Sequence, residues 1–370
     1  MENASVYDEL WGSLVFHESA EGVLRKVQLK GRLQTDVVYF DSSSGDYSDA
    51  LWRRFRFGGK ALFANDLILH LEADLNLNEW GSNNSDGPGP GILNGFGDGG
   101  MWNGLTDAYA GWNPSDAVLL KVGKHSAPFT LDGATSSTGL IALERSIVAE
   151  NLWFTTEYFT GIALVGEKSK WKYRVSGYSS AGDRDLDTME KDVFGSGYFA
   201  LVSLGRDFGG AGLDTLEVRA DYVFNDPDAD GNVGTKNLRQ VACLVGKVEK
   251  GRVGLWADCS AGEGLSGQSD LVGVQLMPFY SFSDTWQLMF RYALVHGLDG
   301  SGVRKARYPH KIDSALSETV ADYYLGLNCY VYDHKVKWQS GVEYTMATGA
   351  SAPASDYEGW GISTGLRISW

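Results

Sequence analysis

Basic side chains occupy every second position in several stretches of this chain, with apolar residues between them. Lys30 and Arg32 follow this rule in one stretch, and Arg54 and Arg56 follow it in the next. Successive side chains of a β-strand point to opposite faces, so these cations share one face of a strand while their apolar neighbours share the other. Guanidinium groups bind carboxylate and phosphate oxygens in pairs and keep their charge at ordinary pH. The chemistry that this pattern suits is the attraction of small anions.

The same alternation assigns many other charged side chains to the polar faces of strands. The cations expected there are Lys30, Arg32, Arg54, Arg56, Lys60, Lys121, Lys172, Arg174, Arg219, Arg239, Lys247, Arg291, Lys335, Lys337 and Arg367, and the acids are Asp36, Glu72, Asp74, Asp107, Glu217, Asp221, Asp258, Asp322 and Glu343. Cations outnumber acids on these faces, although the whole chain has a net charge of −15. Much of the acid must therefore lie in connecting segments.

Period-two alternation recurs in blocks of about ten residues, which is the length of a tilted membrane strand. Between residues 66 and 78, Leu67, Leu69 and Leu71 share one face, whereas His70 and Glu72 share the other. One face suits hydrocarbon and the other suits water. No apolar run is long enough for a helix that crosses a bilayer. A closed barrel, whose strands satisfy all backbone groups laterally, is the remaining way to span a membrane.

We expect sixteen strands, an even number of the kind that bacterial barrels have. They lie near residues 26–40, 52–63, 66–78, 105–112, 117–125, 157–167, 169–180, 196–206, 213–225, 238–249, 251–262, 270–282, 285–296, 320–332, 335–346 and 360–370. The last of these alternates strictly and ends on Trp370, which resembles the aromatic C-terminal signal of outer-membrane barrels. The expected location is the bacterial outer membrane.

The connections between these strands alternate between short and long. Short turns, such as those at residues 64–65, 113–116 and 250–251, are expected to face the periplasm. The long polar stretches at 41–51, 79–104, 126–156, 181–195, 226–237, 297–319 and 347–359 are expected to be extracellular. Residues 1–25 are expected to form a periplasmic segment ahead of one barrel domain, residues 26–370. The first residues lack the features of a secretory signal, so we expect that signal to be absent.

Two stretches resemble the phosphate-selective porin O and P family. One is Trp52-Arg53-Arg54-Phe55-Arg56-Phe57-Gly58-Gly59, and the other runs from Asp107-Ala108-Tyr109 through Val122-Gly123-Lys124, Pro128-Phe129-Thr130-Leu131 and Thr135-Ser136-Ser137 to Glu144-Arg145-Ser146. The resemblance implies a sixteen-stranded antiparallel transmembrane β-barrel, usually trimeric, whose third long loop folds inward and narrows the lumen. Residues 126–156 fit such a loop, because they mix apolar and polar residues and hold few of the glycines that fill 79–104.

Together these patterns predict a porin for passive diffusion of small hydrophilic solutes, anionic or neutral, with a preference for anions that extends to phosphate. The candidate pore-lining cations are Arg32, Arg54, Arg56, Lys60, Lys121, Lys124, Arg145, Lys172, Arg174, Arg219 and Arg291, and the candidate constriction residues are Thr135, Ser136, Ser137 and Glu144. The same cations also suit ordinary salt bridges with Glu72, Asp74, Asp107 and Glu144. Anion preference is therefore a hypothesis, and phosphate specificity is a further one.

Other functions are kept as alternatives or excluded. A sugar-type or non-selective channel and a structural or adhesive barrel stay open. An enzyme is not expected, because His70 has no serine placed beside it by spacing. The segment containing Asp226, Asp228 and Asp230 resembles a calcium loop but has Asn237 where the bidentate Glu belongs, so we favour a metal-free acidic loop and expect no cofactor. The expected partners are outer-membrane lipid and two further copies of the chain, but no nucleic acid, because no basic stripe is present.

Overall fold

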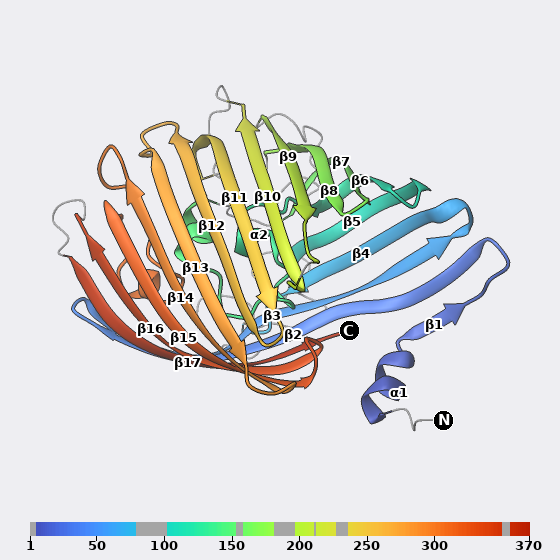
Figure 1. The fold of residues 1–370 in the computed structure, drawn as a ribbon, viewed down its shortest axis with the longest axis horizontal. Helices are drawn as coiled ribbons and strands as arrows, with labels where there is room; N and C mark the ends of the chain where they lie inside the picture. The colour runs from blue at the N-terminus through green and yellow to red at the C-terminus, as the bar shows by residue number, and fades with distance from the viewer. Residues whose placement is uncertain are drawn as a thin grey trace, which may run out of the picture.

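The chain forms a closed antiparallel barrel in the computed structural model, which describes residues 5–78, 102–152, 158–180, 197–210, 212–226, 236–349 and 356–370. Its sixteen strands are β2 (Leu24–Ser42), β3 (Gly45–Phe63), β4 (Leu67–Leu75), β5 (Trp102–Ser115), β6 (Val118–Ser126), β7 (Tyr158–Lys168), β8 (Trp171–Ser179), β9 (Tyr198–Asp207), β10 (Thr215–Asn225), β11 (Leu238–Lys250), β12 (Val253–Gly264), β13 (Leu271–Ser281), β14 (Trp286–Gly297), β15 (Thr319–Tyr332), β16 (Val336–Thr348) and β17 (Tyr357–Ser369). Each pairs with the next, and β17 pairs with β2 to close the ring. The predicted fold class is confirmed (Figure 1).

The two faces of the sheet separate apolar from polar side chains as the alternation predicts. On β4, Leu67, Leu69 and Leu71 are exposed on the outside, while Glu72 on the other face is only 3% exposed. Side chains of opposite character cannot exchange faces without a one-residue slip, so the apolar set fixes the register of each strand. Among the described residues, no helix is long and apolar enough to cross a bilayer.

Two predicted connections are wrong in extent. Residues 41–51 are not a long loop, because β2 and β3 continue through them and leave only a turn at Ser43 and Ser44. Strands that extend beyond the hydrocarbon meet water on both faces and lose the apolar alternation that marks them in the sequence. The turn predicted at residues 113–116 is also shifted, since β5 continues to Ser115. Lys335 lies in the turn between β15 and β16 and is exposed, and it therefore does not line the strand face.

A short helix and strand precede the barrel. Helix α1 (Val6–Gly12) begins at Ser5, whose hydroxyl accepts a hydrogen bond from the Asp8 backbone. Strand β1 (Val15–Glu18) pairs with the start of β2, and the Trp11 indole donates to the Ser369 carbonyl at 2.8 Å. The segment thus lies beside the C-terminal end of the chain, where Figure 1 shows it at one rim of the barrel.

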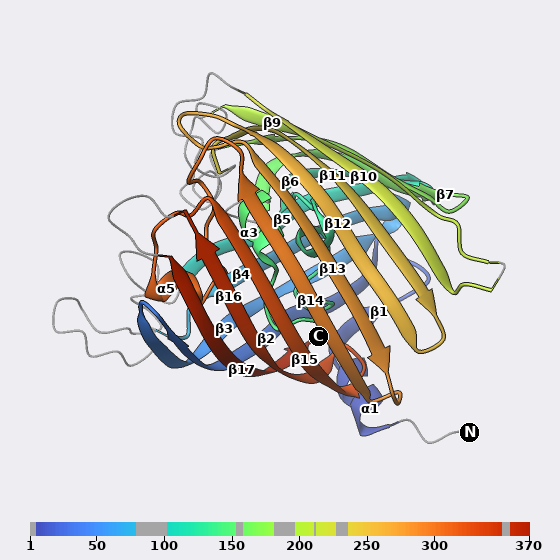
Figure 2. The ribbon, with the colours of Figure 1, turned by 60° about the vertical axis from the view of Figure 1, so that its left-hand side comes forward.

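The connection between β6 and β7 fills part of the barrel interior. We call residues 127–152 the inner loop; it contains the short helices α2 (Leu131–Ala134) and α3 (Ile147–Leu152), seen through the strands in Figure 2. Phe129, Leu131, Ile147 and Leu152 are at most 1% exposed and pack against inward side chains of the wall. Each such burial contributes about 1.5–3 kcal/mol. The apolar residues of this loop therefore form the hydrophobic core of the molecule and hold the loop against the wall.

Candidate pore and its constriction

Polar side chains of the wall hold the backbone of the inner loop in place. A loop without regular structure leaves its carbonyl groups unpaired, and inside a barrel each of these needs a donor. The donors come from strands β2, β14, β15, β16 and β17. The pairs are Gln34 to the carbonyl of Ser137 (3.1 Å), Asn328 to Ile141 (2.8 Å), Arg367 to Leu143 (3.2 Å), Arg291 to Glu144 (2.7 Å), and Lys337 and Gln339 to Leu140.

A β-bulge on β3 brings two consecutive arginines to the lumen. Trp52 pairs with Thr35 and Arg54 pairs with Gln34, so Arg53 is an extra residue without a partner across the ladder. A bulge of this kind interrupts the alternation of faces. Trp52 remains on the outer surface, whereas Arg53 and Arg54 both reach the inner loop.

The carboxylate of Glu144 lies among three arginines. Arg53 donates to both of its oxygens, with 3.0 Å from Nη2 to Oε2, and the nearest guanidinium nitrogen of Arg54 is 4.0 Å away. Arg307, from the connection between β14 and β15, adds a third positive charge. Burial alone raises the pKa of Glu144, but Arg53, Arg54 and Arg307 together hold it well below the usual value. Glu144 is therefore an ionised side chain of the inner loop.

Arg32 and Arg56, which the sequence predicts to line the pore together with Arg54, also have acidic partners. Arg32 donates to the Ser137 hydroxyl at 2.7 Å and lies 3.5 Å from Glu72. Arg56 lies 3.5 Å from Asp74 and donates to the Tyr158 hydroxyl at 2.7 Å. These contacts match the salt-bridge role that the sequence left open.

Three lysines on the same part of the wall have no such partner. Lys30 on β2, Lys60 on β3 and Lys121 on β6 are half-buried, and no carboxylate oxygen of the described chain lies within 4.0 Å of their ammonium groups. The Lys121 ammonium sits 4.5 Å from the centre of the Tyr109 ring, which is a cation–π contact. These lysines lie toward the end of the barrel where the short turns are. They form a positively charged group on the polar face of the wall.

The remaining predicted residues divide between shaping the loop and pairing along the wall. Arg145 donates to the backbone carbonyls of Asp132 and Thr135 within the inner loop, and Lys124 is buried. Ser136 is exposed at the loop surface, and Thr135 donates to the Leu131 carbonyl at 2.7 Å. The wall pairs are Lys172 with Glu217 (2.5 Å), Arg174 with the Tyr178 hydroxyl (3.1 Å), Arg219 with Asp221 (2.9 Å) and Arg291 with Asp322 (3.0 Å). The structure therefore does not gather all predicted cations at one point.

Comparison with known proteins places the chain in a family. The sequence profile of the family described as phosphate-selective porin O and P matches residues 27–241, more than half of the chain. The chain belongs to this porin family. Its members' barrels lie in the bacterial outer membrane, and this chain is accordingly an outer-membrane channel protein.

Solved structures support the architecture of this porin. The outer membrane channel DcaP of Acinetobacter baumannii is 12% identical, with a TM-score of 0.60 over 96% of this chain and 99% of that chain. The anion-selective porin from Comamonas acidovorans is 12% identical, with a TM-score of 0.61 over 93% and 99%. OmpF of Salmonella typhi is 14% identical, with a TM-score of 0.60 over 93% and 98%. At these identities the likeness concerns the fold alone. Comparison with curated protein sequences finds no match.

Sequence reasoning missed two of the three arginines whose charges surround Glu144 in this porin. They are Arg53 and Arg307. Strict alternation places Arg53 toward lipid, yet a charged side chain at that depth costs about 2–4 kcal/mol. Two consecutive arginines in a strand would place one of them toward lipid at this cost. The pair Arg53-Arg54 could therefore have indicated a bulge. Arg307 lies in a connection without periodicity, and its position depends on how that connection folds back over β2 and β3.

The predicted calcium loop falls mostly outside the described part of the porin. Asp226 is described, whereas Asp228 and Asp230 are not. Within the described ranges, no group of three or more His, Cys, Asp or Glu side chains is arranged to hold a metal.

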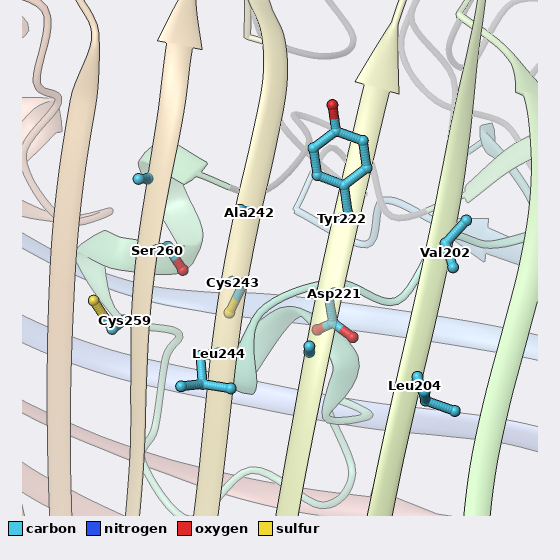
Figure 3. A pocket seen from close by; sticks show the side chains of 11 residues that line it. Val202, Leu204, Asp221, Tyr222, Ala242, Cys243, Leu244, Cys259 and Ser260 are labelled. Carbon is cyan, nitrogen blue, oxygen red and sulfur yellow. The ribbon is translucent and has the colours of Figure 1, made fainter.

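A shallow depression of about 530 Å³ lies on the outer face of β9 to β12 (Figure 3). The small outward side chains of Ala220, Ala242 and Ala261 form its floor, and Val202 and Leu244 border it. The Cys259 side chain is exposed on this face, whereas Cys243 on the neighbouring strand is buried. The depression faces the hydrocarbon of the membrane, so it is no part of the solute path.

Proposed function

We propose that this porin allows passive diffusion of small hydrophilic solutes and prefers anions to cations. The observation that carries the proposal is the group of Lys30, Lys60 and Lys121 on the polar face of the wall, because no carboxylate oxygen of the described residues lies within 4.0 Å of their ammonium groups. In a narrow lumen with low-dielectric walls, each fixed charge acts more strongly on a passing ion than it does in bulk water. A solved porin with the same fold is described as anion-selective, which agrees with this assignment.

The reversal potential of the reconstituted porin tests this proposal. A planar bilayer with a KCl gradient reports the ratio of chloride to potassium permeability directly. We expect a sign that corresponds to chloride permeation. A potential of the opposite sign would reject the proposal, and a potential near zero would favour a non-selective channel.

Phosphate is the specific anion that family membership brings into consideration. Arginine and lysine in the same lumen supply bidentate and single-point contacts to phosphate oxygens, respectively. We expect inorganic phosphate to reduce the chloride current at lower concentration than sulfate does. Equal effects of phosphate and sulfate on the chloride current would indicate a general anion channel without phosphate specificity.

We propose a homotrimer as the assembled form. A solved structure of OmpT from Vibrio cholerae, with the same fold and a TM-score of 0.50, is described as a trimer form. Light scattering of the detergent-solubilised porin, corrected for bound detergent, measures the mass of the protein component. A mass of three chains supports the proposal, and a mass of one chain rejects it.

A further inference from the structure

The Glu144 carboxylate occupies a position that suits an incoming anion. The guanidinium of Arg53 donates one hydrogen bond to each carboxylate oxygen, which is the bidentate geometry in which arginine binds a free carboxylate. Arg54 and Arg307 add two further positive charges around the same point. The Glu144 and Arg53 side chains remain 9% and 11% exposed, so the group still contacts the lumen.

The position of the inner loop does not depend on this side chain. The backbone carbonyl of Glu144 is held by Arg291, and the carbonyls of Ser137 and Ile141 are held by Gln34 and Asn328. Apolar packing of both helices of the loop adds to these contacts. The carboxylate can therefore be replaced while the loop keeps its path.

One arginine of the group has unused hydrogen-bonding capacity. The Nε–H of Arg307 is buried and has no hydrogen-bond partner in the described chain. A buried donor without an acceptor is unfavourable by about 1–3 kcal/mol, and any acceptor that came within its reach would satisfy it. The neighbouring Tyr308 ring packs on Phe40 and Tyr47 and donates through its hydroxyl to Asp36, which fixes this part of the connection.

We infer that Arg53, Arg54 and Arg307 form a binding site for the carboxylate group of a small organic acid, and that Glu144 is a tethered competitor for that site. The arriving carboxylate takes over the bidentate contact with Arg53, and the positive charges of Arg54 and Arg307 attract it. Glu144 limits how tightly the solute is held, so that the solute also leaves. This inference rests on the proposed channel function and adds a solute class to it.

Succinate block of the chloride current in planar bilayers tests the inference. The wild type is compared with Glu144→Gln, which keeps the size of the side chain but removes the competing charge. We expect the half-blocking succinate concentration to fall about tenfold in this variant, because the bidentate contact with Arg53 is then open to the solute. We expect the opposite change, a several-fold increase, in Arg307→Gln.

Glu72→Gln is the matched control. Glu72 on β4 is a lumen carboxylate, 3% exposed, that lies 3.5 Å from the Arg32 guanidinium and outside the Glu144 group. If Glu72→Gln lowers the half-blocking concentration as much as Glu144→Gln does, a general change of the lumen field accounts for the effect and the inference is overturned. An unchanged value in Glu144→Gln also overturns it.

Pore width and ion preference are measured separately from succinate block. The size of polyethylene glycol that still enters the pore should be the same in Glu144→Gln and wild type; a wider pore with weaker block would mean that Glu144 is merely structural, and would overturn the inference. If Glu144→Gln does not insert, Arg307→Gln still decides, because Arg307 lies outside the strands. The reversal potential reports ion preference independently, so a cation-selective wild type would reject the proposed function without deciding the carboxylate site.

Discussion

Arg53 of the barrel wall donates two hydrogen bonds to the carboxylate of Glu144 in the inner loop, 91 positions further along the chain. The contact exists because a bulge turns Arg53 inward and because the inner loop returns to β3 after crossing the lumen. The ion pair thus depends both on the bulge in β3 and on the path of the inner loop. Its consequences for permeation, stability and folding can each be measured.

Replacing the three unpaired lysines should reduce the preference for anions. The triple change Lys30→Gln, Lys60→Gln and Lys121→Gln removes three positive charges from the lumen and breaks no salt bridge within the described residues. We expect the chloride-to-potassium permeability ratio, measured from reversal potentials, to fall by roughly an order of magnitude. Lys172→Gln is the control, because Lys172 is paired with Glu217 and 46% exposed; its effect should be small. An equal effect of the control would remove the three lysines from the selectivity site.

Loss of the Arg291 side chain should destabilise the barrel and loosen the inner loop. Arg291→Met leaves the Asp322 carboxylate buried without its partner and frees the Glu144 carbonyl. Breaking a buried pair on one side costs about 3–5 kcal/mol. Urea unfolding in detergent or lipid vesicles measures this loss. Arg239→Gln, which breaks the exposed pair with Glu263, should cost less than about 1 kcal/mol; a similar loss in both variants would contradict the assigned role of Arg291.

The position of a residue can be predicted from the sequence where apolar and polar side chains alternate regularly along its strand. Leu71 and Glu72 on β4 follow this alternation, and their faces and strand follow from the pattern alone. Arg53 does not follow it, because the bulge shifts the period at one position only. The partners of Arg291 could not be predicted either, since Glu144 reaches it through a loop whose path is set by packing and by carbonyl satisfaction. Local periodicity thus predicts the barrel, whereas the path of the inner loop depends on tertiary contacts.

The Glu144 ion pair should contribute to stability in a pH-dependent way. The pKa of Glu144 in the folded protein lies below that of an unfolded glutamate, which is about 4.3. Its contribution is therefore fully present above that pH and is lost as the pH falls through the folded pKa. The difference in melting temperature between wild type and Glu144→Gln should be constant from about pH 8 to 5 and should shrink in more acidic solution. A difference that shrinks already at neutral pH would mean that Glu144 is not held ionised.

A charge on the lipid face should be costly at mid-depth and tolerated at the rim. Leu71 is in the middle of β4 and faces outward, so Leu71→Arg should lower the unfolding free energy by about 2–4 kcal/mol. Val253 is the first residue of β12 and is also exposed, and Val253→Arg should cost at most about 1 kcal/mol. Unfolding in lipid vesicles measures both values. Equal costs would contradict the assigned membrane depth of these positions.

Deleting Arg53 should leave the barrel able to fold, whereas deleting a neighbouring regular residue should not. Thr35 and Gln34 are consecutive on β2 and already pair with Trp52 and Arg54, so removal of Arg53 restores a regular ladder and keeps both halves of β3 in register. Removal of Phe57 instead slips one half of β3 by one residue and exchanges its lipid and lumen faces. We expect the Arg53 deletion to keep the heat-dependent mobility shift of a folded barrel in gel electrophoresis and the Phe57 deletion to lose it. Loss of folding in both variants would contradict the bulge, because only an extra residue can be removed without a change of register.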